Sequence, residues 1–410
     1  MSKPLLRNIS ARTLRIDGEQ MIVLEDPEHF GPNTLCVPYN EPMVFILTLL
    51  DGNHSVLDIQ SAFMKRFGTM LMSERINEIL DALDKNYFLR NERFQNRRDS
   101  IVRDFRESPV RKSCMEGVSY PGNIEQLEIL MKSMQTAGKK RTEDKTVSSR
   151  KIRGVIAPHI DFMRGGKVYG SIYNALPRTE KPETVVIFGT VHSPNKSLLI
   201  PTKKSFSTPL GELAVDEEIL SELENRLGAD YLYKDEFSHR GEHSIEFQIL
   251  WLQYLYQHKK GVRIVPILCS SFEPFIRNGK SPSEDKEYTL FLDSLREILE
   301  EKDRNYLMIA GADLSHIGPS FGDESPLTPE FMDEVQHFDK RMLKSACSAG
   351  SEAFFHSVAE NGDKYRVCGL PPIYAMLYML RESQGEVLDY EQSLDPQKTT
   401  SVSFAGIVFY

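Results

Sequence analysis

The sequence lacks the features that mark membrane-spanning proteins and disulfide-rich secreted proteins. It contains no apolar run of about 18 residues, the length needed for a transmembrane helix. The first residues, MSKPLLRNIS, have no apolar core of the kind found in signal peptides. The five cysteines are odd in number and form no CxxC pair, which is typical of a reducing compartment. We therefore expect a cytoplasmic protein.

The sequence also lacks a region of strongly one-signed charge. Its formal net charge of -9 is spread along the chain, which argues against nucleic acid or an anionic membrane as the main partner. Several catalytic signatures are absent: there is no GxSxG elbow, P-loop, GxGxxG turn or HExxH helix. A Ser-His-Asp hydrolase is therefore disfavoured. With 410 residues and 40% apolar content, the chain has the composition of two or three ordinary globular domains.

Residues 1–99 are predicted to form a small domain rich in helix. Apolar residues recur at helical spacing in three segments, NEPMVFILTLLDG, SVLDIQSAFMKRFG and SERINEILDALDKNYFLR. The short apolar segment that ends the third of these predicts a β-wing, so we expect a winged-helix domain. The order of these elements resembles the small PqqD-like domains that accompany radical-SAM enzymes. That resemblance implies recognition of a peptide or a partner protein; a purely structural appendage is the alternative.

The remainder divides into a polar linker and a larger α/β domain. Residues 100–150 are polar and are expected to form a linker and, around NIEQLEILMKSM, an amphipathic helix that leads into the larger domain. Residues 151–410 alternate apolar, β-branched runs with amphipathic helices such as EHSIEFQILWLQYLYQH. This alternation predicts an α/β fold whose sheet is covered by helices. The five predicted strands are IRGVIA, ETVVIFG, VRIVPIL, NYLMIAG and SVSFAGIVFY.

Titratable side chains follow several of these strands. Because ligands gather at the carboxyl ends of parallel strands, we expect these side chains to share one pocket. Imidazoles with a thiolate suit iron, copper or zinc, while nearby carboxylates and a further imidazole suit outer-shell or proton-transfer roles. A cysteine nucleophile with a histidine base stays open as well. The candidates are His159, Asp161, His192, His243, Glu246, Asp313, Ser315, His316 and Cys368.

Seven motifs stand out in this region: SCMEGVSYPGNIEQLEILM, IAPHIDFMRGG, FGTVHSP, SFSTPLGELAVD, EHSIEFQILWLQ, GADLSHIG and RVCGLPPIYAML. They resemble motifs of the Memo family, whose bacterial branch is the AmmeMemoRadiSam system protein B. They occur in the family's order over roughly residues 111–410. The resemblance implies a fold like the catalytic subunit of class III extradiol dioxygenases. It also implies a radical-SAM protein and an AMMECR-type protein as partners.

The resemblance implies a mononuclear metal site holding Fe(II) or copper and serving redox or oxygenase-like chemistry. Its ligands are expected to be His159, His192 and Cys368, the last as third ligand or adjacent redox thiol. Around them, His243 or His316 is expected to carry protons, and Asp313 to orient a ligand. Two alternatives stay open: a non-catalytic protein that binds a peptide or phosphorylated partner, and a hydrolase that uses Cys368. The resemblance supplies no role for Asp161.

Overall fold

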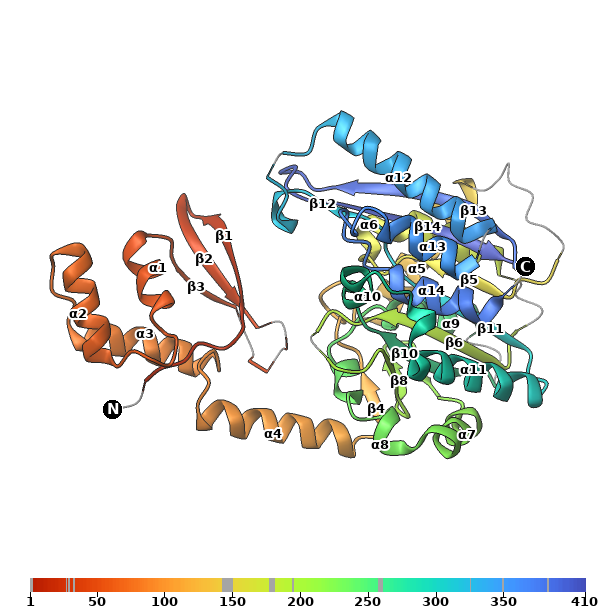
Figure 1. Cartoon of the computed structure of the whole chain (residues 1–410), viewed down its shortest axis with the longest axis horizontal. Helices are drawn as coiled ribbons and strands as arrows, with labels where there is room; N and C mark the ends of the chain where they lie inside the picture. The colour runs from red at the N-terminus through yellow and green to blue at the C-terminus, as the bar shows by residue number, and fades with distance from the viewer. Residues whose placement is uncertain are drawn as a thin grey trace. The chain divides into compact units, whose positions relative to one another are not determined.

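The chain forms two compact units, Met1–Glu107 and Ser108–Tyr410 (Figure 1). This computed structural model describes residues 3–410 except 27, 29, 32–33, 142–149, 177–180, 194, 257–260, 325, 349 and 382. Helix α4 (Glu92–Glu107) runs through residue 99, where we place the first domain boundary from the sequence. Part of the predicted linker, residues 142–149, lies outside the described residues.

The first unit opens with a three-stranded antiparallel sheet of order β1-β2-β3. Asp17 and Gly18 join the first two strands, with φ of 50° and 86°. Two successive positive φ values define the tight hairpin turn for which an Asp-Gly pair is favoured. The Asp-Gly pair therefore sets the register that places Ile16 opposite Glu19. The strands are β1 (Ser10–Ile16), β2 (Glu19–Glu25) and β3 (Leu35–Pro38).

The three helices predicted in the first unit are confirmed as α1 (Glu41–Thr48), α2 (Val56–Phe67) and α3 (Ser73–Lys85). Helix α2 begins at a capping box formed by Ser55 and Asp58. It ends at Gly68, which adopts a left-handed backbone conformation. Glycine adopts this conformation with little strain because it has no Cβ atom. Apolar residues of the sheet and the helices form the core of the unit.

The predicted β-wing after the third helix is wrong. Residues Glu92–Glu107 form helix α4 instead, and the strands of the unit precede the helices. Phe94, Ile101 and Phe105 are the buried residues of α4, and their spacing of seven and four residues is that of one helix face. Between α3 and α4 the chain forms one isolated bridge, which pairs Leu89 with Leu6. The order of the elements therefore differs from the winged-helix order that we predict.

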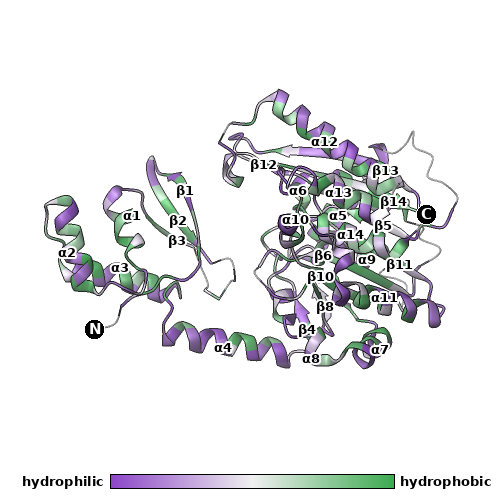
Figure 2. Cartoon of the chain, viewed as in Figure 1, coloured by the Kyte–Doolittle hydropathy of each residue, from purple (hydrophilic) through white to green (hydrophobic). Residues whose placement is uncertain are grey.

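The second unit is built on an eight-stranded sheet, in which β12-β14-β5-β11-β6-β10-β7 are neighbours in that order and β13 pairs with β14. The inner strands β5, β11, β6 and β10 are parallel. All five predicted strands are present in this sheet, and Figure 2 shows hydrophobic residues concentrated along its central strands. The strands are β5 (Gly154–Ala157), β6 (Thr184–Thr190), β7 (Leu199–Pro201), β10 (Arg263–Cys269), β11 (Tyr306–Gly311), β12 (His316–Ile317), β13 (Gly385–Leu394) and β14 (Ser401–Phe409).

Helices cover both faces of the large sheet, as predicted (Figure 1). Helix α9 packs over Gly311 of β11, and α14 packs over Gly154 of β5 on the other face. A smaller sheet joins β4 (Val110–Lys112), β8 (Ser205–Thr208) and β9 (Gly211–Leu213). The helices are α5 (Ile124–Arg141), α6 (Phe162–Ala175), α7 (Glu217–Leu227), α8 (Ala229–Leu232), α9 (Glu246–Tyr256), α10 (Glu273–Asn278), α11 (Lys286–Glu301), α12 (Pro329–Ser348), α13 (Gly350–Ala359) and α14 (Leu370–Leu380), with short 3-10 turns at Glu236–Arg240, Pro282–Glu284 and Pro319–Phe321.

Helix α5, predicted from NIEQLEILMKSM, packs closely on α6 through two glycines. A Cβ atom on Gly138 would lie 2.0 Å from the carbonyl carbon of Gly170. A Cβ atom on Gly170 would lie 2.0 Å from the backbone oxygen of Met134. Only residues without a side chain allow the two backbones to approach this closely. Helix α5 is therefore part of the larger unit.

Candidate metal centre

His159 follows the buried strand β5 and is itself buried. Its backbone N–H donates to Oδ1 of Asp313 over 2.9 Å, and its Nδ1 lies 2.9 Å from the carbonyl oxygen of Gly311. Since a carbonyl oxygen only accepts, Nδ1 carries the ring proton. The other nitrogen, Nε2, therefore keeps its lone pair and faces Sγ of Cys368 at 3.4 Å.

His192 follows strand β6, which is separated from β5 by β11, and is held by Glu242. Its Nδ1 lies 2.9 Å from Oε2 of Glu242, which also accepts from the backbone N–H of His192 at 3.0 Å. A carboxylate that accepts from Nδ1 leaves Nε2 as the nitrogen that can coordinate a metal. Glu242 thus fixes both the position and the tautomer of His192.

Cys368 lies at the start of α14, in the loop that precedes the helix. The Thr190 hydroxyl donates to the carbonyl oxygen of Cys368 at 3.1 Å, and the N–H of Gly369 donates to the carbonyl oxygen of Asp313 at 3.0 Å. A Cβ atom at Gly369 would lie 2.2 Å from that same oxygen, so glycine is required for this approach. The loop is thereby drawn against the ends of β6 and β11.

The structure brings together the three side chains predicted as ligands. One nitrogen each of His159 and His192 and the Sγ atom of Cys368 all lie within 4.8 Å of one another. The two imidazole rings are perpendicular, with centroids 5.1 Å apart. A second group of the same kind is formed by His192, Glu242 and His243. Imidazole nitrogen and thiolate sulfur are ligands that suit a transition metal, so the donor set fits such an ion.

His243 stacks on His192, with ring centroids 5.1 Å apart and planes at 12°. Its Nδ1 lies 3.3 Å from Oε1 of Glu242. Its ring is also 5.6 Å from that of His159, so it lines the same site. Burial lowers the pKa of His243 to about 4 against the opposing charge of Glu242, and the ring is neutral at pH 7.

Asp313 and His316 lie beside this group and outside its set of potential ligands. Oδ2 of Asp313 is 3.7 Å from Nε2 of His159. His316 directs Nδ1 to the carbonyl oxygen of Leu314 at 3.0 Å and packs its ring on Phe321. Burial raises the pKa of Asp313, and burial lowers the pKa of His316 to about 4. The charge of each group acts on the pKa of the other, so the two lie close together.

Burial also sets the protonation of the predicted ligands. It lowers the pKa of His159 to about 4, and the neighbouring His192 adds to this effect. Burial alone would lower the pKa of His192, but the charge of Glu242 outweighs it and raises that pKa. Burial raises the pKa of the Cys368 thiol well above its ordinary value. Without a positive charge at the site, Cys368 is therefore a protonated thiol at pH 7.

Glu242 is the site residue that the sequence patterns did not single out. It stands in RGEHSIE directly before His243, and it is buried. Its carboxylate accepts from the backbone N–H groups of His192, His243 and Ser244. The charge of His192 and these hydrogen bonds hold the pKa of Glu242 far below its ordinary value, although burial opposes them. A glutamate next to a candidate histidine was the available signal.

Glu246, one turn further on, has a structural role. Its carboxylate pairs with buried Arg111 and accepts from the Tyr120 hydroxyl and from the backbone N–H groups of Cys114 and Met115. Arg111 also donates to the backbone oxygen of Glu242. This network ties the segment that precedes α5 to the loop carrying Glu242 and His243. The network therefore helps to hold the loop of Glu242 and His243 in position.

Asp161, for which the family resemblance supplies no role, caps helix α6. Its Oδ1 accepts from the backbone N–H groups of Met163 and Arg164 at 3.0 Å and 3.1 Å. Its Oδ2 pairs with the Arg164 side chain at 2.5 Å. The bonds to the two N–H groups are those of a helix N-cap, so the Asp161 side chain has a structural role at the start of α6.

A polar cleft of about 440 Å³ adjoins the candidate centre at His192. Asn195, Lys196, Ser270 and Glu273 are among its lining residues. The Ser270 hydroxyl donates to Oδ1 of Asn195 at 2.6 Å, so the wall of the cleft is held in place. His192 therefore borders this cleft.

The fold and the donor set define a class: an α/β protein with a candidate metal centre at the carboxyl ends of its parallel strands. Residues 111–408 match the family described as Memo-like protein. This match covers more than half of the chain, and the chain belongs to the Memo family. Among the described residues, no helix has the length and apolar character needed to cross a membrane.

The chain is similar in sequence to MEMO1 family proteins from several organisms. A MEMO1 family protein of Aquifex aeolicus is 29% identical over 400 residues, which cover 96% of both chains. A MEMO1 family protein of Thermus thermophilus is 25% identical over 352 residues, covering 86% of this chain and 98% of the relative. One from Thermococcus onnurineus is 28% identical over 310 residues, and its match covers 99% of its own length but 73% of this chain. The match to the Thermococcus onnurineus protein thus leaves about a quarter of the present chain unaligned.

Proposed function

We propose that the chain binds one Fe(II) or copper ion through Nε2 of His159, Nε2 of His192 and Sγ of Cys368. The observation that carries the proposal is the orientation of the two rings. Each Nδ1 is turned to an acceptor, Gly311 or Glu242, so that each Nε2 presents a lone pair. Cys368 provides the soft donor beside them at 3.4 Å from His159. Two imidazoles and a thiolate favour iron or copper over the hard cations magnesium and calcium.

The proposed activity is redox or oxygenase-like chemistry on a small polar molecule that enters by the cleft beside His192. A bound iron or copper ion supplies one-electron redox chemistry. His243 and His316, both neutral at pH 7 because burial lowers their pKa values to about 4, accept protons in the site. Asp313 holds the backbone of His159 in place through its Oδ1.

Metal analysis of the protein purified without chelator tests this proposal. Wild-type protein is expected to carry close to one equivalent of iron or copper, and the double variant His159→Ala, His192→Ala to carry none. His337→Ala, which removes an exposed imidazole, is the matched control and is expected to keep the metal. Wild-type protein without iron or copper, or a double variant that retains it, would overturn the proposal.

The contact between Cys368 and His159 also suits a cysteine hydrolase, the second candidate function. Such an enzyme needs a thiolate and a basic imidazole. Here burial raises the pKa of Cys368 and lowers that of His159 to about 4, so the pair rests as neutral thiol and neutral ring. These directions favour the metal site. Rapid alkylation of Cys368 by iodoacetamide in metal-free protein would favour the hydrolase instead.

For the first unit, we propose binding of a peptide segment of a radical-SAM partner protein. Support comes from Leu57 and Met64, which lie seven residues apart on α2 and are 54% and 56% exposed. Co-elution of the purified radical-SAM protein in size-exclusion chromatography tests the proposal. Leu57→Asp is expected to abolish co-elution, and Val118→Asp, in the second unit, to preserve it. Equal co-elution of the two variants would contradict the proposal.

A further inference from the structure

A cavity of about 840 Å³ lies in the second unit, at the edge of the sheet opposite the candidate metal centre. Arg150 precedes β5 and Tyr410 follows β14, whose Phe409 pairs with the first residue of β5. Both line the cavity, whereas His159 follows the other end of β5. The cavity therefore has no residue in common with the site described above.

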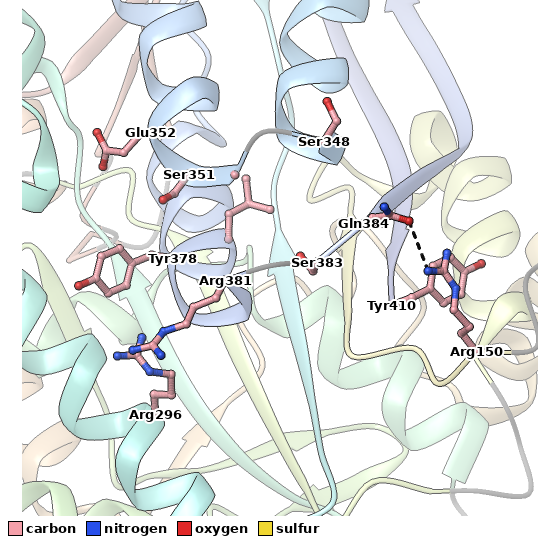
Figure 3. A pocket seen from close by; sticks show the side chains of 12 residues that line it. Arg150, Arg296, Ser348, Ser351, Glu352, Tyr378, Arg381, Ser383, Gln384 and Tyr410 are labelled. Atoms are coloured by element: carbon pink, nitrogen blue, oxygen red, sulfur yellow. Dashed lines mark hydrogen bonds between the residues drawn. The ribbon is translucent and has the colours of Figure 1, made fainter.

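Three arginines line this cavity together with a single glutamate. Figure 3 shows Arg296, from α11, and Arg381, at the end of α14, pointing toward each other beside the ring of Tyr378. Both guanidinium groups act on the pKa of Tyr378 and oppose its rise on burial. Two like charges that converge repel each other, so their arrangement is favoured by an anion placed between them.

Arg296 keeps most of its donors for such an anion. Its side chain is 7% exposed, and its ion pair is with Asp293 on the same helix, through Nη2. The guanidinium group has five N–H donors, and Nη2 alone donates to an acceptor within the described part of the chain. The glutamate of the cavity, Glu352, directs its oxygens to the hydroxyls of Ser281 and Tyr374. It therefore leaves Arg296 and Arg381 without its charge.

Arg381 occupies a backbone conformation that favours glycine, with φ of 50° and ψ of -123°. Holding a residue with a side chain there strains the backbone. Its guanidinium group has no ion pair or hydrogen bond with the described residues of the chain. Arg381 thus lines the cavity in a strained conformation, with no counter-charge among the described residues, and this arrangement favours ligand binding over a role in folding stability.

We propose that this cavity binds a small phosphate monoester, with its phosphate between Arg296 and Arg381. Forked guanidinium donors match the oxygens of a phosphate group. The hydroxyls of Ser351 and Ser383 line the same cavity and provide further donors. The ring of Tyr378 forms an aromatic wall for the organic part. The volume of the cavity is within the range for ligands of this size.

Calorimetric titration of the full chain tests the proposal with four probes: inorganic phosphate, glucose 6-phosphate, AMP and citrate. Inorganic phosphate and at least one monoester are expected to bind, and citrate to bind at least 10-fold more weakly than that monoester. Absence of binding by all the phosphate probes would overturn the proposal. Equal or tighter binding of citrate would overturn the assignment to phosphate.

The variant Arg381→Gly separates ligand binding from folding. Glycine adopts the backbone conformation of Arg381 more easily, so the melting temperature is expected to rise. Loss of the guanidinium group is expected to weaken phosphate binding 10-fold or more. Arg277→Gln is the matched control, because it removes the same charge from an exposed position outside the cavity. Unchanged affinity in Arg381→Gly, or equal weakening in Arg277→Gln, would refute the proposal.

Arg296→Gln gives a second test on the opposite wall, with its fold checked by circular dichroism. It is expected to weaken phosphate binding as Arg381→Gly does, and a folded Arg296→Gln protein with wild-type affinity would refute the proposal. Metal content distinguishes this proposal from the proposed function. Arg381→Gly is expected to keep its metal, and the double variant His159→Ala, His192→Ala to keep phosphate binding. Loss of phosphate binding in that double variant would show that the probe binds at the histidines.

Discussion

Nδ1 of His192 lies 2.9 Å from Oε2 of Glu242, a residue that stands fifty positions further along the chain. The same carboxylate oxygen accepts from the backbone N–H of His192, so ring and backbone are held by one group. The other oxygen accepts from the N–H groups of His243 and Ser244. Glu242 therefore connects the end of β6 with the start of α9.

Removing the Glu242 carboxylate is expected to weaken metal binding about 10–100-fold, because His192 loses the partner that orients it. The variant is Glu242→Gln, and the measurement is competition for iron or copper against a chelator of known affinity. Glu212→Gln, at an exposed position, is the control. An affinity for the metal equal to that of wild type would show that His192 is positioned without Glu242.

The buried pair of Arg111 and Glu246 is expected to stabilise the larger unit. Replacing Glu246 by Leu leaves Arg111 buried without a counter-charge, and a loss of about 3–5 kcal/mol in the free energy of unfolding is expected. The double variant Arg111→Met, Glu246→Leu removes both charges and is expected to recover part of that loss. Urea denaturation measures both. A double variant no more stable than the single one would contradict this account.

The close approach of α5 and α6 is expected to reject any side chain at Gly170. An alanine methyl there would lie 2.0 Å from the backbone oxygen of Met134, so the helices must separate. A loss of about 1–3 kcal/mol is expected, although alanine favours a helix more than glycine does. Thermal denaturation of Gly170→Ala provides the measurement, with exposed Thr136→Ala in α5 as control. A melting temperature at or above that of wild type would refute this packing.

His239 is expected to make the stability of the larger unit depend on pH. It is buried, with Nε2 2.8 Å from the carbonyl oxygen of Ile200, and burial lowers its pKa from 6.5 to about 3. Below pH 6.5 the unfolded chain therefore binds a proton that the folded chain does not. Its contribution is complete above pH 6.5 and decreases as the pH falls toward 3, by about 1.4 kcal/mol per pH unit.

The measurement compares the free energy of unfolding of wild type and His239→Gln between pH 7 and pH 4.5. The wild-type slope is expected to exceed the slope of the variant by about that amount. His337→Gln, which replaces an exposed imidazole, is expected to keep the wild-type slope. Equal slopes for wild type and His239→Gln would mean that the folded protein protonates this ring.

The local pattern of apolar residues was enough to predict individual strands and helices of the fold. Continuous apolar runs marked β5, β6, β10, β11 and β14 of the large sheet, because a strand buried on both faces must be apolar throughout. The longest strand, β13, is partly exposed and carries no such run, so it was not predicted. The β-wing prediction failed although local signals pointed elsewhere. Phe94, Ile101 and Phe105 carry a helical period, and Asp17-Gly18 is a hairpin signal that precedes the helices.

The sequence by itself determined which residues end the parallel strands, and so which imidazoles and carboxylates lie along one edge of the sheet. Contacts between residues far apart in the chain set the order of the strands, the position of the loop that carries Cys368 and the contact of Glu242 with His192. Only the tertiary structure decided these features. The same holds for Arg296 and Arg381, which converge from two helices without sharing a motif. Local periodicity records which face of an element is buried, whereas the convergence of side chains is set by how the elements pack.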